Sequence, residues 1–172
     1  AKGNRWGYFP AASFAWKIKE EGFLRNAAAL SDLKLRLGYG EVGNQNIPPY
    51  SYLTPFGATE AFLADASGGS LIPVVPLNLA NPDLKWETAI QYNAGLDFSL
   101  FDDRLSGTVD TYLKTSSDLL LKVSLGPTAG FDFITANQGD IENKGLEVSL
   151  RGDIIRNDNV KWSMFGNISF NR

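Results

Sequence analysis

Residues 88–114, TAIQYNAGLDFSLFDDRLSGTVDTYLK, decide the fold of this chain. Apolar and polar residues alternate before and after the segment FDDR at 101–104. Successive side chains of a β-strand point to opposite faces, so each run has one largely apolar and one largely polar face. An Asp-rich turn between two alternating runs is typical of a β-hairpin. The apolar set of the first run is Ile90, Tyr92, Ala94, Leu96, Phe98 and Leu100, and its polar set is Gln91, Asn93, Gly95, Asp97 and Ser99.

The same alternation extends over most of the chain and predicts an all-β protein. A stretch at 23–30 is compatible with a single turn of helix, and short strands are possible near 50–56 and 72–75. We expect the main strands at residues 5–17, 33–41, 84–100, 105–121, 141–155 and 161–171. Consecutive strands of this kind form an antiparallel up-and-down meander.

The connections between these strands alternate in length. Long segments at 42–83 and 122–140 contrast with short turns at 101–104 and 156–159. An antiparallel meander places all the long loops at one end, which is typical of outer-membrane barrels. Strands of roughly 11 to 17 residues also exceed the usual soluble length and suffice to cross a bilayer. Aromatic residues near both strand ends fit interfacial girdles, namely Trp16, Phe101 and Trp162 at one end and Trp6, Trp86 and Tyr112 at the other. We therefore expect part of a large transmembrane β-barrel whose polar strand face lines a lumen. The residues expected to face the lumen are Gln91, Asn93, Asp97, Asp110, Glu147, Arg151 and Asn167.

Composition excludes several function classes. The 172 residues are 44% hydrophobic and 20% charged, which is ordinary for a globular or barrel protein and unlike a disordered one. Histidine and cysteine are absent, so disulfides, thiolate metal sites and the usual general base are excluded, and we expect no metal and no cofactor. A net charge of −3 without a basic cluster argues against nucleic acid as a partner.

Residues 38–43, GYGEVG, match the G-x-G-x-x-G pattern of dinucleotide-binding loops. That site requires a helix to begin at the third glycine. The chain continues with NQNIPP at 44–49, which cannot form the start of such a helix. Glycines at the point where a strand bends into a loop explain the pattern better.

Two alternatives to a barrel segment remain open. A secreted β-sandwich that binds carbohydrate would also alternate, but with shorter strands and more frequent turns. A glycosidase would need a carboxylate pair, which could come from the acidic residues Asp110, Asp118, Asp132, Asp140 and Glu142. Nothing in their spacing selects a pair, so we do not expect an enzyme.

Ligand contacts are expected in the long loops, because function concentrates in loops held by a rigid scaffold. Aromatic side chains there offer flat faces for sugar rings or peptide side chains. The candidate ligand-facing residues are Tyr50, Tyr52, Phe56, Phe131 and Phe133.

Several spaced motifs carry a family resemblance. They are RWGYFPAASFAWKI, LSDLKLRLGYGEVGNQNIPPYSY, LANPDLKWETAIQYNAGLDFSLFDDRLSGTVDTYLKTSSDLLL, GDIENKGLEVS and KWSMFGNISFN. Together they cover nearly the whole chain, which resembles the C-terminal half of SusC/RagA-like TonB-dependent outer-membrane transporters of the Bacteroidetes. The resemblance implies that residues 1–172 are a fragment of a TonB-dependent receptor β-barrel domain, without its plug and remaining strands. It also implies a place in the cell outer membrane, a SusD-like surface lipoprotein partner, TonB contacted through a missing N-terminal segment, and a glycan or peptide as the imported substrate.

Overall fold

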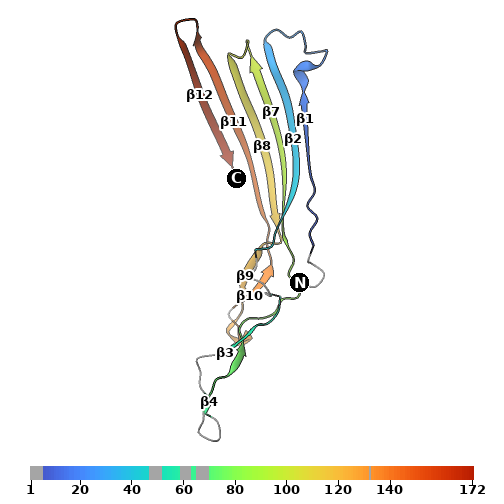
Figure 1. The fold of residues 1–172 in the computed structure, drawn as a ribbon, viewed down its shortest axis with the longest axis vertical. Helices are drawn as coiled ribbons and strands as arrows, with labels where there is room; N and C mark the ends of the chain where they lie inside the picture. The colour runs from blue at the N-terminus through green and yellow to red at the C-terminus, as the bar shows by residue number, and fades with distance from the viewer. Residues whose placement is uncertain (1–5, 47–51, 59–62, 65–69, 132) are drawn as a thin grey trace. The chain divides into compact units, whose positions relative to one another are not determined.

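The computed structural model describes residues 6–46, 52–58, 63–64, 70–131 and 133–172. Its main element is a six-stranded sheet in the order β1-β2-β7-β8-β11-β12 (Figure 1). The strands are β1 (Ala11–Lys17), β2 (Leu30–Asn44), β7 (Glu87–Leu100), β8 (Leu105–Ser117), β11 (Ile141–Arg156) and β12 (Lys161–Asn171). Neighbours in the sheet follow chain order, as expected for the all-β antiparallel meander.

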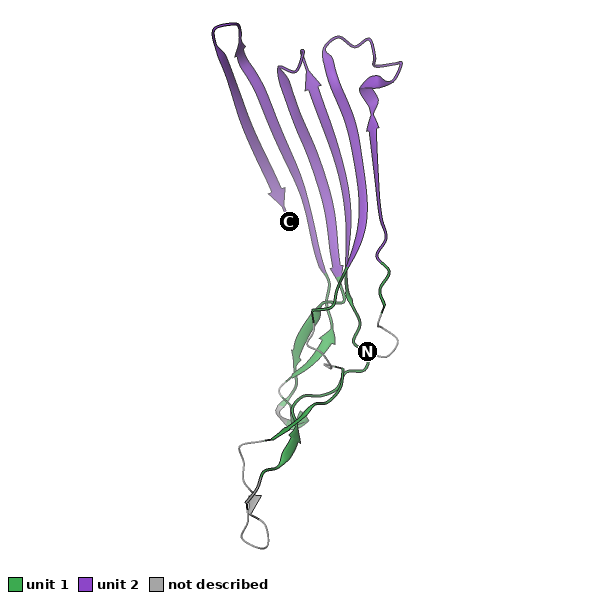
Figure 2. Ribbon diagram, in the orientation of Figure 1, with its two compact units in different colours: residues 1–8, 43–88, 117–140 green, residues 9–42, 89–116, 141–172 purple. Residues whose placement is uncertain are grey.

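The chain divides into two compact units, coloured in Figure 2. Unit 2 consists of residues 9–42, 89–116 and 141–172 and contains most of the six-stranded sheet. Unit 1 consists of residues 1–8, 43–88 and 117–140.

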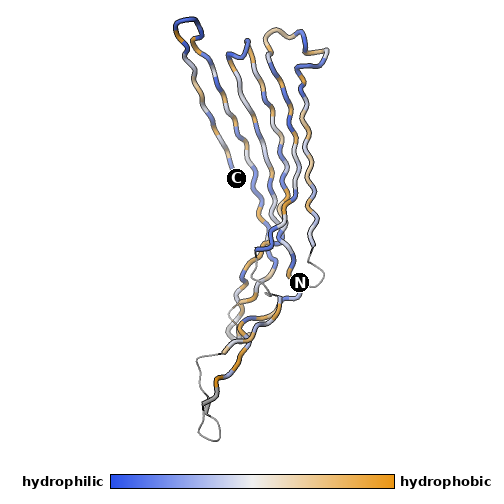
Figure 3. The backbone as a smooth tube through the Cα atoms, viewed as in Figure 1, coloured by the Kyte–Doolittle hydropathy of each residue, from blue (hydrophilic) through white to orange (hydrophobic). Residues whose placement is uncertain are grey.

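Cross-strand register in unit 2 confirms the two faces of the sheet. Asp110 of β8 pairs with Glu147 of β11, which pairs with Ser169 of β12. The next row along the strands is apolar and consists of Val109, Val148 and Ile168. Figure 3 shows the alternation of hydrophilic and hydrophobic residues along the strands. We call the side of Asp110 the polar face and the side of Val148 the apolar face.

Within the described residues of unit 2, no buried hydrophobic residue forms a core on the apolar face of the sheet. Leu84, which belongs to unit 1, is the only buried hydrophobic residue among those that the structure describes. Large apolar side chains of the sheet are exposed, including Phe14, Leu37, Tyr92, Leu146, Leu150, Ile168 and Phe170. A β-sandwich buries such a face against a second sheet. The exposed apolar face therefore does not fit the sandwich alternative.

The short turns lie together at one end of the sheet (Figure 1). In the β7–β8 turn, Phe101, Asp102 and Asp103 have positive φ values of 56°, 52° and 65°. Asp tolerates this left-handed conformation better than most residues. Neighbouring segments hold the turn: the Phe101 amide donates to the carbonyl of Ala29, just before β2, at 2.9 Å, and Arg156 Nη1, from the end of β11, donates to the Asp102 carbonyl at 3.0 Å.

The connection between β1 and β2 differs from its expected helical turn. Residues 23–30 form successive turns that lead into β2, and the nearby 3-10 element η1 is Ile18–Glu20. Lys19 Nζ donates to the carbonyls of Leu24, Arg25 and Ala27 at 3.1, 3.1 and 2.8 Å. This ammonium group replaces the backbone donors that a continuing helix would supply. The connection therefore contains hydrogen-bonded turns and no regular helix beyond η1.

Unit 1 is built from short two-stranded ladders. They pair β3 (Phe56–Ala58) with β6 (Val74–Pro76), β4 (Leu63–Ala64) with β5 (Ser70–Leu71), and β9 (Leu120–Ser124) with β10 (Phe133–Asn137), and a 3-10 turn η2 (Pro127–Ala129) lies between β9 and β10. Short strands near 56 and 74 were expected, whereas β10 and the later part of β9 lie where a loop was expected at 122–140. The strand expected at 105–121 is divided because Asp118 takes a left-handed φ of 59° and ends β8.

A side-chain network stabilises unit 1 where its segments meet. Asn137 Nδ2 donates to the carbonyls of Lys85 and Asp118, both at 2.9 Å, and its Oδ1 accepts from the Lys85 amide at 2.9 Å. Lys85 Nζ also pairs with Asp118 Oδ2 at 2.7 Å. We call these three residues the Asn137 network. They connect three segments that are distant in sequence.

The first strand begins later than expected, at Ala11 rather than near residue 5. Pro10 has no amide hydrogen, so the regular ladder can begin only after it. The Pro10 carbonyl still accepts from the Glu41 amide at 2.9 Å.

Within the described part of the chain, no helix is long and apolar enough to cross a membrane.

Candidate functional site

An ion cluster of Arg36, Asp97 and Asp110 lies on the polar face. Arg36 comes from β2, Asp97 from β7 and Asp110 from β8, so three adjacent strands contribute to it. Arg36 Nε donates to Asp97 Oδ2 at 2.9 Å, and its Nη2 donates to Asp97 Oδ1 at 2.7 Å. Nη2 also donates to Asp110 Oδ1 at 2.8 Å. A guanidinium held by two oxygens of one carboxylate has a fixed orientation as well as a neutralised charge.

Gly95 provides the space that this arrangement needs. It lies on the polar face of β7, between the strands that carry Arg36 and Asp110. A Cβ atom at this position would overlap Asp110 Oδ1 and would lie 2.7 Å from Arg36 Nη2. The missing side chain therefore lets the guanidinium pass over β7 to reach β8.

Two hollows flank the ion cluster on the polar face. The smaller, of about 270 Å³, has a floor of small residues and is lined by Ser13, Ala15, Gly38, Asn93 and Gly95 beside Arg36 and Asp110. The larger, of about 570 Å³, lies toward the short turns and includes Asp97, Ser99, Thr108, Ser149, Arg151 and Phe165. Hydroxyl, carboxylate and guanidinium groups can bind a polar ligand or a polar protein surface, and the 69% exposed Phe165 adds a flat apolar ring.

The aromatic residue Tyr112 also lies on the polar face. Its ring covers Gly145 of β11, where an added Cβ would lie 2.6 Å from the ring, and its hydroxyl donates to Asn171 Oδ1 at 3.0 Å. An aromatic ring over a strand glycine fills the gap left by the missing side chain. The expectation that Tyr112 belongs to an outward-facing interfacial girdle is therefore wrong.

The predicted ligand-facing aromatics belong to unit 1. Tyr50 lies outside the described residues. Phe56 is in β3 and 67% exposed, whereas Phe133 is in β10, so the two occupy separate two-stranded sheets. Lys122 Nζ lies 4.5 Å from the centroid of the Phe133 ring and covers one of its faces. Tyr52 and Phe131 are half-buried. Their role in ligand binding stays a prediction.

Three of the five carboxylates considered for glycoside hydrolysis are engaged in ion pairs. Asp110 contacts Arg36 at 2.8 Å, Asp118 contacts Lys85 at 2.7 Å, and Glu142 contacts Lys144 at 3.1 Å. Asp132 lies outside the described residues. Within the described ranges, no three His, Cys, Asp or Glu side chains are grouped so that they could hold a metal ion.

The sequence indicated Asp97 and Asp110 as lumen-facing but did not single out Arg36 or Gly95. Parity alone places Arg36 on the polar face of its strand. Its contact with Asp97 and Asp110 depends on the register between β2, β7 and β8, which no local pattern determines. The available signal for Gly95 was its place among the polar residues of an alternating strand, where a side chain is missing.

Comparison with known proteins gives a consistent result over the whole chain. Residues 1–172 match the family model described as TonB dependent receptor-like, beta-barrel. TonB-dependent receptor SusC of Bacteroides thetaiotaomicron is 38% identical over 173 residues, covering 99% of this chain and 17% of the relative. TonB-dependent receptor P39 of Formosa agariphila is 39% identical over 166 residues, covering 96% of this chain and 15% of the relative.

Solved structures agree with the sequence relatives. The RagAB peptide transporter matches with a TM-score of 0.81 at 31% identity, covering 98% of this chain and 18% of that one. The RagAB peptide importer in the open-open state matches with a TM-score of 0.84 at 30% identity, covering 99% and 18%. The chain thus spans less than a fifth of the length of the proteins that it matches. The family match, the identities and the shared meander show that this chain belongs to the TonB-dependent receptor-like β-barrel family.

Proposed function

We propose that this chain is a wall segment of an outer-membrane TonB-dependent importer. The observation that carries the proposal is the six-stranded sheet with one polar face and one uncovered apolar face. Lipid would cover the apolar face, and the polar face, with its ion cluster, would line the lumen. β7, β8 and β11 have 14, 13 and 16 residues, which exceeds the roughly 9 to 11 needed to span a bilayer at a tilt.

Further strands would close the sheet into a barrel. β1 and β12 form the two edges of the described sheet, and open edges of this length favour aggregation. Membrane barrels have at least about eight strands. The domain would therefore contain further strands beyond the six of the described sheet. The family resemblance implies, in addition, a plug in the lumen.

The imported substrate would be a glycan or a peptide. RagAB is named as a peptide importer, and the SusC/RagA resemblance implies glycans as the other class. A SusD-like surface lipoprotein would cover the entrance, and TonB would act through a segment outside this chain. The aromatics of unit 1 would contact the substrate. The paired carboxylates give no support to catalysis, so we infer that the segment is not an enzyme.

A topology experiment tests the proposal. A protease site inserted after Gly126, an exposed position between β9 and β10, should be cut on intact cells that express the full-length protein. The same site inserted after Asp103, in the β7–β8 turn, should be cut only after the outer membrane is permeabilised. Cutting of both sites on intact cells, or recovery of the protein without detergent, would contradict the membrane assignment. The reverse pattern would contradict the assignment of the long connections to the outside.

A further inference from the structure

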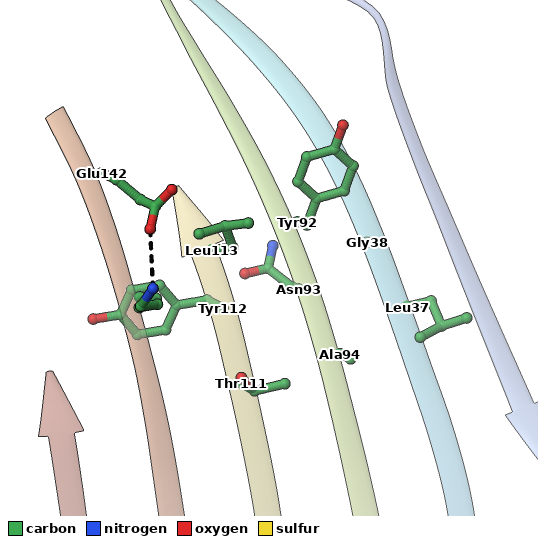
Figure 4. A pocket seen from close by; sticks show the side chains of 10 residues that line it. Leu37, Gly38, Tyr92, Asn93, Ala94, Thr111, Tyr112, Leu113 and Glu142 are labelled. Carbon is green, nitrogen blue, oxygen red and sulfur yellow. Dashed lines mark hydrogen bonds and ion pairs between the residues drawn. The ribbon is translucent and has the colours of Figure 1, made fainter. Parts of the chain in front are cut away.

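The apolar face is hollowed near the end of the sheet opposite the short turns. A groove of about 660 Å³ runs across β2, β7 and β8 (Figure 4). Small side chains form its floor, Ala94 on β7 and Thr111 on β8, while Leu37, Tyr92 and Leu113 form its sides. A face that only needs to contact lipid would not require such a hollow. Its apolar lining suits a hydrocarbon chain.

Beyond this groove, the part of the apolar face formed by β11 and β12 carries basic side chains. Leu146 and Phe170 form an apolar row across β11 and β12. The next row outward has Lys144 on β11, and Arg172 beside it. Lys144 and Arg172 exchange both backbone hydrogen bonds at 2.9 Å, which places their side chains on the same face of neighbouring strands. The change from apolar to basic side chains is expected where hydrocarbon meets lipid head groups.

A second hollow connects the groove to these cations. It has a volume of about 310 Å³, is lined by Phe170 and Arg172, and shares Thr111 and Lys144 with the groove. Glu142 Oε1 contacts Lys144 Nζ at 3.1 Å, and these side chains are 54% and 56% exposed. Two cations and one carboxylate leave a charge of +1 at the rim. The rim therefore attracts an anion while the groove beside it accepts an acyl chain.

We propose that this groove and its rim bind a phosphorylated, acylated lipid of the outer leaflet. The acyl chain would lie over Ala94 and Thr111, and the phosphate would contact Lys144 and Arg172. This inference rests on the proposed function, because it needs the apolar face to meet lipid and the long connections to lie outside. A protein partner is disfavoured because the groove lies on the face that would meet hydrocarbon.

Lipid retention by the full-length protein tests the proposal. The protein would be purified into nanodiscs that contain a phosphorylated lipid A or its phosphate-free form, and bound lipid would be counted by native mass spectrometry. The wild type should retain the phosphorylated lipid and not the phosphate-free one. Lys144→Gln with Arg172→Gln should weaken retention roughly tenfold or more, because both cations that would contact the phosphate are removed.

Two further variants separate charge from shape. Lys114→Gln removes one positive charge from β8 at an exposed position on the opposite, polar face, since Lys114 pairs with Asn143 rather than Lys144. It should leave retention unchanged. Ala94→Phe fills the groove floor and should lower retention of the lipid while Lys144 and Arg172 remain.

The outcomes distinguish this proposal from the proposed function. Equal retention by the wild type and the Lys144/Arg172 double variant, in protein that inserts into nanodiscs, would overturn the lipid site and leave the barrel assignment intact. Equal loss in Lys114→Gln would also overturn it, because the effect would then be one of total charge. Failure of the wild type to insert into nanodiscs would overturn the proposed function itself.

Discussion

The two units of this chain are stabilised in different ways. In unit 2, long ladders satisfy the backbone, and the apolar face is exposed along its length. Unit 1 has ladders of two to five residues, the buried Leu84, and the Asn137 network between its segments. The stability of the sheet therefore depends on what covers its faces, whereas the stability of unit 1 depends on a few specific hydrogen bonds.

The largest expected effect is on the apolar face of the sheet. Val148 pairs with Val109 and Ile168, so Val148→Arg would place a guanidinium in hydrocarbon at a cost of roughly 2 to 4 kcal/mol near the midplane. We expect the full-length variant to be depleted from the outer membrane, as measured by the amount of folded, heat-modifiable protein on gels.

Two matched variants test the reason for that loss. Ser149→Arg changes the adjacent residue on the polar face, opposite Thr108 and Asn167, and should assemble at near-normal levels. Val148→Trp should also assemble, because lipid accommodates a larger apolar side chain whereas a packed core would lose about 1 to 3 kcal/mol. If Val148→Trp were as damaging as Val148→Arg, the apolar face would be a protein core.

The next effect concerns unit 1. Asn137→Ala removes the side chain that bonds to Lys85 and Asp118, and we expect a local loss of about 1 to 3 kcal/mol. Hydrogen exchange of segments 81–85, 117–124 and 133–139 should accelerate, while the barrel still assembles. The control is Gln138→Ala, a change at the adjacent exposed residue, which should leave hydrogen exchange unchanged.

The effects of Asn137→Ala and Val148→Arg show whether the two units are stabilised independently. If Asn137→Ala blocked assembly as strongly as Val148→Arg, unit 1 would be required for the sheet to form. If it left hydrogen exchange unchanged, the Asn137 network would not hold unit 1 together.

The sequence predicted the sheet better than unit 1 for a physical reason. Alternation is a local signal of strand faces, so the faces of Asp97, Asp110 and Val148 followed from parity. The Asn137 network joins residues 52 and 19 positions apart, and no local pattern marks such contacts. Likewise, the turn at Asp118 that separates β8 from β9 depends on a left-handed φ that its neighbours do not specify.

The candidate site shows the same limit. Each member of the ion cluster has the expected parity, but the contact between Arg36 and Asp110 crosses an intervening strand. That contact exists because Gly95 lacks a side chain, and glycine in a strand has several explanations. Only the register between β2, β7 and β8 distinguishes these explanations for Gly95.

A smaller effect is expected on the polar face of the sheet. Gly95→Ala should displace the Arg36 guanidinium from Asp110 and lower the unfolding temperature of the detergent-solubilised barrel, at a cost of about 1 kcal/mol because the cluster is partly exposed. Gly38→Ala, on the same face, adds a Cβ with ordinary contacts of 3.6 Å to Asn93 and should be neutral.

A double-mutant cycle tests the cause. In an Arg36→Met background, Gly95→Ala should have a smaller effect, because no guanidinium remains to be displaced and the unpaired Asp110 side chain is free to move away. Additive losses would mean that Gly95 serves the backbone of β7 and not the ion cluster.

The smallest expected effect concerns the β9–β10 ladder in unit 1. Lys122 Nζ lies 4.5 Å from the Phe133 ring centroid, and an exposed cation–π contact contributes about 0.5 to 1 kcal/mol. Lys122→Met keeps the length of the side chain and removes its charge. A ladder of five residue pairs has few other stabilising contacts, so hydrogen exchange of residues 120–124 and 133–137 should accelerate a few-fold. In a Phe133→Leu background the same change should have no further effect, because the ring is gone. A few-fold acceleration in both backgrounds would show that Lys122 acts through its charge on other groups, and the face of Phe133 would then be free to contact a ligand.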